Sequence, residues 1–250
     1  MEISLAAEPI FFAGDFPVTN TMINTWLVIL LWTIIGLMVA KKVIFVPKAL
    51  QNILEMVVFA FWDLCQSLAG ERGKKFFPLV TTIFIFIITC NWLNLLPGFG
   101  SLGIWEEGIH GRKFIPLLRG ATSDLNTTVA LALVSVGAIQ YYGIKALGPR
   151  VHFSKFFNFS SPIAFFVGVL ELISEFSKII SFSFRLFGNV FAGEVLLTVI
   201  AFLIPVLAPF PFYGLEFFVG FIQAFVFAML TLAFLNIATI PHGEEVAHGT

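Results

Sequence analysis

The sequence predicts an all-α integral membrane protein that forms a single membrane domain over residues 1–250. Only 12% of the residues are charged, against roughly 25% in an ordinary soluble domain, and 58% are hydrophobic. Apolar runs of about 20 residues, the length needed to cross a bilayer, recur along the chain, and we expect no strands. A net charge of −1 lacks the excess of Lys and Arg that phosphate neutralisation needs, which excludes nucleic acid as a partner.

The amino-terminal part predicts one membrane-spanning helix, one interfacial helix and two further membrane helices. Residues 1–23 are expected to form an external amino terminus, on the outer side of the membrane, and the first span covers 24–46. Residues 47–70 are apolar at helical spacing but are interrupted by polar side chains, which favours an amphipathic helix in the interface. The two further membrane helices are expected at 76–96 and 125–147, with a loop rich in Gly, Pro and charge between them.

The carboxyl-terminal sequence predicts a long hairpin of two antiparallel helices, 162–204 and 212–240. With about 1.5 Å per residue the first arm would be roughly 65 Å long, about twice the thickness of the hydrocarbon. It must therefore tilt strongly or break. Lys and Arg are concentrated in 41–75 and 145–155, so the positive-inside rule places the amino terminus outside and the carboxyl terminus in the cytoplasm.

Arg185 is an anomaly because it lies deep inside the first arm of this hairpin. A charged guanidinium costs about 2.5–3.5 kcal/mol at the centre of a membrane helix on insertion scales, so we expect it to have a function. No carboxylate lies three or four residues away on its own helix. In an antiparallel pair, Gln223 would be level with Arg185, whereas Glu194 and Glu216 would be roughly 10–13 Å nearer the turn. We expect its counter-charge to come from another subunit; the alternative is stabilisation by backbone carbonyls.

Glu194 and Glu216 form a second candidate site, since the same pairing places them level with each other. Two carboxylates that close cannot comfortably both ionise, so at least one is expected to take up and release a proton near neutral pH. The alternative is a pair of separately hydrated carboxylates. Asp124 and Asn126 lie at the outer start of the 125–147 helix, where they either cap the helix or line an entrance from the outside.

Several sequence strings resemble subunit a of the F-type ATP synthases. They are FRLFGN (184–189), AGE (192–194), QAFVF (223–227), DLNTTVALAL (124–133), and NW (91–92) before LLP (95–97). The resemblance covers most of the chain from about Gly70, and the Arg-Leu-Phe-Gly-Asn string with a Gln in the next helix is highly specific. The amino-terminal region is similar only in its layout.

The resemblance implies a stator subunit that provides two half-channels for protons beside a rotating ring of small hairpin subunits, each with one membrane carboxylate. It implies that Arg185 is the essential arginine facing these carboxylates. The implied proton path consists of Glu194, Glu216, Gln223, Asn189, Asp124 and Asn126. Peripheral-stalk subunits, a soluble ATPase head and the lipid bilayer are the other implied partners. The chain itself would not be an enzyme, and its location would be a bacterial plasma membrane or a thylakoid.

Two other function classes are less favoured by the sequence. A cytochrome-like electron-transfer subunit needs His residues facing each other within the bundle, but all four His lie in predicted loops or the tail. A stand-alone ion-coupled secondary transporter should show two related halves, and we find no such repeat. Cys65 and Cys90 lie in apolar segments and indicate neither a disulfide framework nor a metal site, and we expect no cofactor.

Overall fold

The protein is mainly helical. The computed structural model describes residues 7–41, 49–96, 103–108, 111–156, 161–204 and 207–240. The α-helices are α1 (Asn20–Lys41), α2 (Ala49–Ala69), α3 (Gly73–Asn94), α4 (Leu125–Leu147), α5 (Pro149–Ser154), α6 (Pro162–Leu203) and α7 (Pro209–Ala238). Five helical stretches within the described residues are long and apolar enough to cross a membrane. The predicted class, an all-α integral membrane protein, is confirmed.

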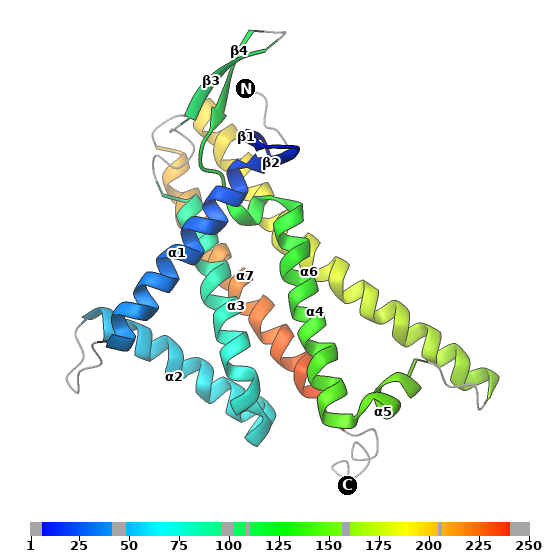
Figure 1. Cartoon of the computed structure of the whole chain (residues 1–250). Coiled ribbons are helices and arrows are strands. Elements are labelled where there is room, and N and C mark those ends of the chain that lie inside the picture. Colours follow the sequence, from blue (N-terminus) through cyan, green and yellow to red (C-terminus); the bar gives the residue numbers. More distant parts are fainter. Residues whose placement is uncertain are drawn as a thin grey trace.

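The expectation of no strands was wrong for two short antiparallel hairpins. The strands β1 (Pro9–Ala13) and β2 (Phe16–Thr19) precede α1, and β3 (Gly103–Gly108) and β4 (Gly111–Pro116) lie between α3 and α4. Each strand has at most six residues, which is too short for an alternating pattern to stand out in the sequence. Figure 1 shows both hairpins at the same end of the molecule, with β3 and β4 projecting beyond the helices.

Glycines and prolines set the helix ends. Gly70 has a φ of +54°, in the left-handed region that favours glycine, and it separates α2 from α3. Gly148, with a φ of +82°, ends α4, and the following Pro149 opens the short helix α5, which the sequence analysis missed. Helix α7 begins slightly before the expected residue 212, because Pro209 occupies the first turn, where no backbone N–H is needed.

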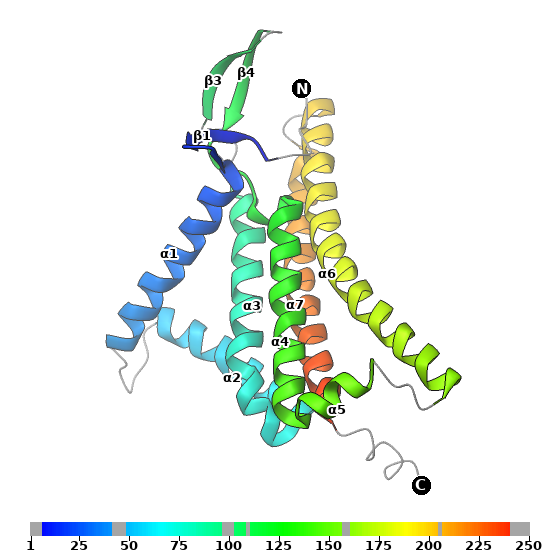
Figure 2. The same ribbon diagram turned by 45° about the vertical axis from the view of Figure 1, so that its right-hand side comes forward.

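The first arm of the hairpin is one continuous helix of 42 residues. Ser161 caps its start by accepting a hydrogen bond from the Ala164 backbone N–H at 3.1 Å. Figures 1 and 2 show α6 strongly inclined to α4, so that its first half leaves the bundle while its second half lies beside α7. Helix α2 runs across the end of α3, but its predicted location in the membrane interface stays a prediction. Part of the expected first span, residues 42–46, lies outside the described residues.

The core lies where α3, α4, α6 and α7 meet. Phe76 of α3, Ile139 of α4, Phe182 of α6 and Phe227 of α7 are among its fully buried large side chains. The rings of Phe182 and Phe227 stack with their centroids 4.8 Å apart. Because buried aromatic pairs of this kind contribute both area and specific geometry, this stack fixes the register of the two hairpin helices. That register decides which polar side chains of α6 and α7 meet.

Candidate functional site

A polar cavity of about 190 Å³ lies between α3, α6 and α7. Its polar lining residues are Asn91, Asn94, Asn189, Glu194, Thr198, Tyr213, Glu216 and Gln223. Liquid water occupies about 30 Å³ per molecule, so the cavity has room for several waters. Of the residues that the sequence analysis selected, four line this cavity and three do not. The three outside it are Asp124, Asn126 and Arg185.

An amide pair joins α6 to α7 at the inner part of the cavity. Asn189 Nδ2 donates a hydrogen bond of 2.7 Å to Gln223 Oε1. Gln223 is buried, and its Nε2 has no hydrogen-bond partner among the described residues. The hairpin register predicted Gln223 level with Arg185, whereas the structure places it against Asn189, about one helical turn further along α6. The unpaired Nε2 leaves a buried donor for a water or a ligand group.

The two glutamates line the same cavity from opposite helices. Glu216 of α7 lies directly against Gly193 of α6, where its carboxyl group occupies the position that a Cβ would take. Glu194 is the next residue on α6. Its side chain is 29% exposed, and its Oε2 is buried without a hydrogen-bond partner among the described residues. The absence of a side chain at Gly193 therefore makes room for the second carboxyl group beside the first.

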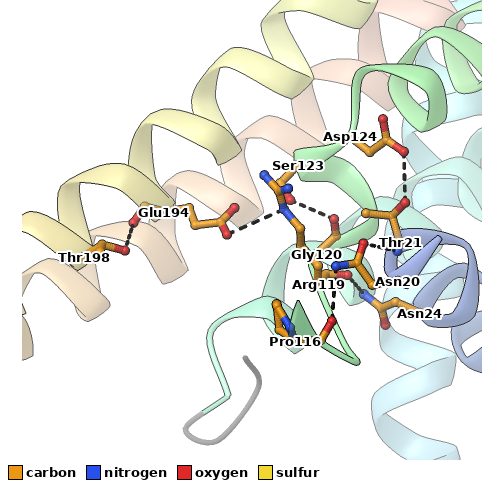
Figure 3. Close-up of polar contacts among 10 residues, drawn as sticks. All are labelled: Asn20, Thr21, Asn24, Pro116, Arg119, Gly120, Ser123, Asp124, Glu194 and Thr198. Atoms are coloured by element: carbon orange, nitrogen blue, oxygen red, sulfur yellow. Dashed lines mark hydrogen bonds and ion pairs between the residues drawn. The ribbon is translucent and has the colours of Figure 1, made fainter. Parts of the chain in front are cut away.

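Arg119 brings a positive charge to Glu194 that the sequence analysis missed. Its Nε lies 3.8 Å from Glu194 Oε1, and only 7% of its side chain is exposed. Figure 3 shows Arg119 reaching from the loop before α4 toward α6. In the sequence, Arg119 is one of the charged residues of the loop between the predicted membrane helices 76–96 and 125–147. No local spacing could have connected it to a glutamate on a distant helix, because the contact depends on how the loop packs against α6.

Asp124 connects the start of α4 to the start of α1. Its Oδ1 accepts a hydrogen bond from the Asn126 backbone N–H at 3.0 Å, so Asp124 is the N-cap of α4. Its Oδ2 accepts a bond of 2.9 Å from Thr21 Oγ1 at the start of α1 (Figure 3). Both oxygens thus have structural partners, which agrees with the capping alternative. The alternative in which Asp124 and Asn126 line an outer entrance stays a prediction.

Arg185 lies on α6 and is not among the residues that line the cavity. Its Nη2 donates a hydrogen bond of 3.2 Å to Ser181 Oγ, one turn earlier on the same helix. No carboxylate of the described residues lies within ion-pair distance of its guanidinium, which is partly exposed. Within the described residues, this permanently charged group in an apolar segment is thus left with one neutral hydrogen-bond partner.

The chain was compared with known protein families and proteins. Residues 21–236 match the model of a family described as "ATP synthase A chain". The chain belongs to the ATP synthase A chain family. It is 36% identical to ATP synthase subunit a of Moorella thermoacetica, over 94% of this chain and 96% of the relative. It is 36% identical to that of Syntrophobacter fumaroxidans, over 88% and 84%, and 34% identical to that of Geotalea daltonii, over 85% and 84%.

As a member of the ATP synthase A chain family, the chain is a multi-pass membrane protein. The matched segment runs from the start of α1 almost to the end of α7 and therefore contains the whole cavity and Arg185. The transporter alternative gains no support from these relatives. Among the described residues, no group of three or more His, Cys, Asp or Glu side chains could hold a metal ion.

A second charged cluster lies around Glu175 and Lys178, in the first half of α6. Lys178 Nζ lies 2.8 Å from Glu175 Oε1, and Lys155 Nζ lies 3.9 Å from the same oxygen. The buried His152 side chain is beside them, with its Nε2 2.7 Å from Gln140 Oε1. Burial and the neighbouring Lys155 lower the pKa of His152 below its ordinary 6.5, while Glu175 opposes this shift. The cluster thus pairs its carboxylates with cations and holds a histidine that resists protonation.

Proposed function

We propose that this chain is the stator subunit of a rotary ATP synthase and provides two half-channels for protons. In this proposal Arg185 is the essential charge that faces the carboxylates of a rotating ring of small hairpin subunits. The observation that carries the proposal is the isolation of Arg185: it is a permanent cation on a long membrane helix with no carboxylate partner in the described chain. A ring carboxylate would supply the missing counter-charge.

The physical basis is the cost of moving a charge into lipid. A deprotonated ring carboxylate is stabilised next to Arg185, because the guanidinium never loses its proton and can bind a carboxylate on two sides. Once protonated, the carboxyl group is neutral and can turn into the lipid without the cost of an unpaired buried ion. The fixed charge of Arg185 also disfavours direct passage of a cation between the two half-channels. Rotation is then required for each proton.

The polar cavity is proposed as the outer half-channel. Glu194 and Glu216 would take up protons from the outside, and the amides of Asn189 and Gln223 would line the inner end of the path. Two observations support this: the cavity has room for water, and two of its polar atoms, Glu194 Oε2 and Gln223 Nε2, have no partner among the described residues. Asp124 and Asn126 are retained as candidates for the outer entrance.

The proposed setting follows from the family. The chain would lie in a bacterial plasma membrane with its amino terminus outside and its carboxyl terminus in the cytoplasm. Its proposed partners are the ring, the peripheral-stalk subunits and the soluble ATPase head. The chain itself would not catalyse a reaction.

The decisive experiment is Arg185→Ala in membranes that contain the assembled complex, with ATP-driven proton pumping as the measurement. We expect pumping to be abolished while the complex still assembles. Arg150→Gln, on the exposed face of α5, is the matched control and should pump normally. Coupled pumping in the Arg185→Ala complex would refute the central role of this residue. For the cavity, Glu194→Gln together with Glu216→Gln should slow proton entry, and an unchanged rate would remove both from the path.

A further inference from the structure

We propose that Arg119 is a positioning residue of the outer proton path, where it acts through Glu194. Its guanidinium lies beside one oxygen of the Glu194 carboxylate and supplies a fixed positive charge, which holds this side chain in the orientation needed for proton transfer. This inference deepens the proposed function and rests on it. The inference rests on the contact between Arg119 and Glu194, two largely buried charged side chains from distant parts of the chain.

The loop that carries Arg119 is held in place from two sides. Asn24 Nδ2 of α1 donates a hydrogen bond of 3.0 Å to the Arg119 carbonyl oxygen, and this bond is buried. On the other side, Gly120 packs so tightly against Asn94 of α3 that a Cβ at Gly120 would lie 2.7 Å from Asn94 Cγ. A loop with this packing leaves the Arg119 backbone little freedom. The direction of its side chain toward α6 is therefore set by the fold (Figure 3).

The two oxygens of Glu194 lie in different surroundings. Oε1 is 3.8 Å from Arg119 Nε, a distance that indicates an ion pair rather than a hydrogen bond. Oε2 is buried without a hydrogen-bond partner among the described residues. The ion pair with Arg119 therefore fixes one oxygen of the carboxylate and leaves the other without a partner among the described residues. Arg119 cannot itself relay protons, because its guanidinium stays charged at all relevant pH values.

The charge of Arg119 matters because the other ionisable residues that line the described cavity, Glu216 and Tyr213 of α7, cannot contribute a positive charge. Without Arg119, the Glu194 carboxylate would lose the fixed charge beside its Oε1 and with it this orientation.

The test is passive proton conduction in membrane vesicles that contain the complex stripped of its soluble head, measured between pH 6 and 8.5. Arg119→Gln should conduct roughly tenfold more slowly, because the neutral amide no longer holds the Glu194 carboxylate. Arg119→Lys keeps the charge, and its conduction rate and pH dependence should be much closer to those of the unmodified complex. Arg150→Gln is the matched control for removing an arginine and should leave conduction unchanged.

A double variant separates this role from simple loop packing. If Arg119 acts through Glu194, then Arg119→Gln should cause no further loss in a Glu194→Gln background. If Arg119→Gln alone fails to assemble, restored assembly in the double variant still supports the pair, because the unpaired buried carboxylate has been removed. Failure of both to assemble would overturn the proposal.

Two other outcomes are also decisive. Equal losses in Arg119→Gln and Arg119→Lys would show that Arg119 only packs the loop. Normal conduction in Arg119→Gln, with conduction impaired in Glu194→Gln, would refute the role of Arg119 and leave the proposed function intact. Normal ATP-driven pumping in Arg185→Ala would instead overturn the proposed function itself.

Discussion

The contact between Gly193 and Glu216 gives the sharpest prediction for the cavity. A methyl group at Gly193 would collide with the Glu216 carboxyl group, which would have to move from its present position. Gly214, on α7 near Glu216, is a matched control, because a Cβ there would meet no atom within 4 Å. Both Gly→Ala changes improve helix propensity by about 1 kcal/mol, so the comparison isolates the effect of the collision.

The expected loss of proton conduction in Gly193→Ala follows from the free-energy cost of overpacking. Extra methyl groups in a filled site cost about 1–3 kcal/mol, and a displaced Glu216 would return to its present position only at that cost. The fraction of complexes with Glu216 in this position would then fall by about 5- to 150-fold. If proton uptake requires this position, passive conduction through Gly193→Ala membranes should fall by a similar factor. Gly214→Ala should stay within about twofold of the unmodified complex, as expected for an open site.

A rescue experiment distinguishes displacement of Glu216 from a general loss of structure. Glu216→Asp shortens the side chain by one methylene and should recover part of the conduction in the Gly193→Ala background. The amount of assembled complex is measured in parallel by immunoblotting. Fully assembled Gly193→Ala complexes that conduct protons at the normal rate would refute the reasoning, because the position of Glu216 beside Gly193 would then be irrelevant to the path.

Two further predictions concern stability. Because the folded state lowers the pKa of His152, the unfolded chain binds more protons as the pH falls through 6.5, so the complex should lose stability from about pH 6.5 downward. Thermal denaturation between pH 8 and 5.5 checks this, and a His152→Gln variant with the same pH dependence would contradict it. Thr21→Val removes the hydroxyl donor to Asp124 and should cost about 1–3 kcal/mol. Thr33→Val, at an exposed site, should change the melting temperature little, and equal melting temperatures for the two variants would contradict the second prediction.

The helices were largely predictable from the sequence because their signals are local. Apolar length and the cap at Asp124 depend on neighbouring residues only. The isolation of Arg185 on its own helix was also visible, since it follows from the residues one turn away. The two short β-hairpins and α5 were missed, because elements of four to six residues carry too little pattern to be recognised.

The candidate site, like the fold, was only partly predictable from the sequence. The sequence alone determined that Arg185, Glu194, Glu216 and Gln223 are unusual, because charged and polar groups in apolar segments are costly wherever they lie. Only the tertiary structure decided their partners: Gln223 bonds Asn189, Glu216 fills the space left by Gly193, and Arg119 reaches Glu194. The physical reason is that an energetic cost belongs to a residue and its local segment, whereas a contact depends on helix register and loop packing over long distances in the chain.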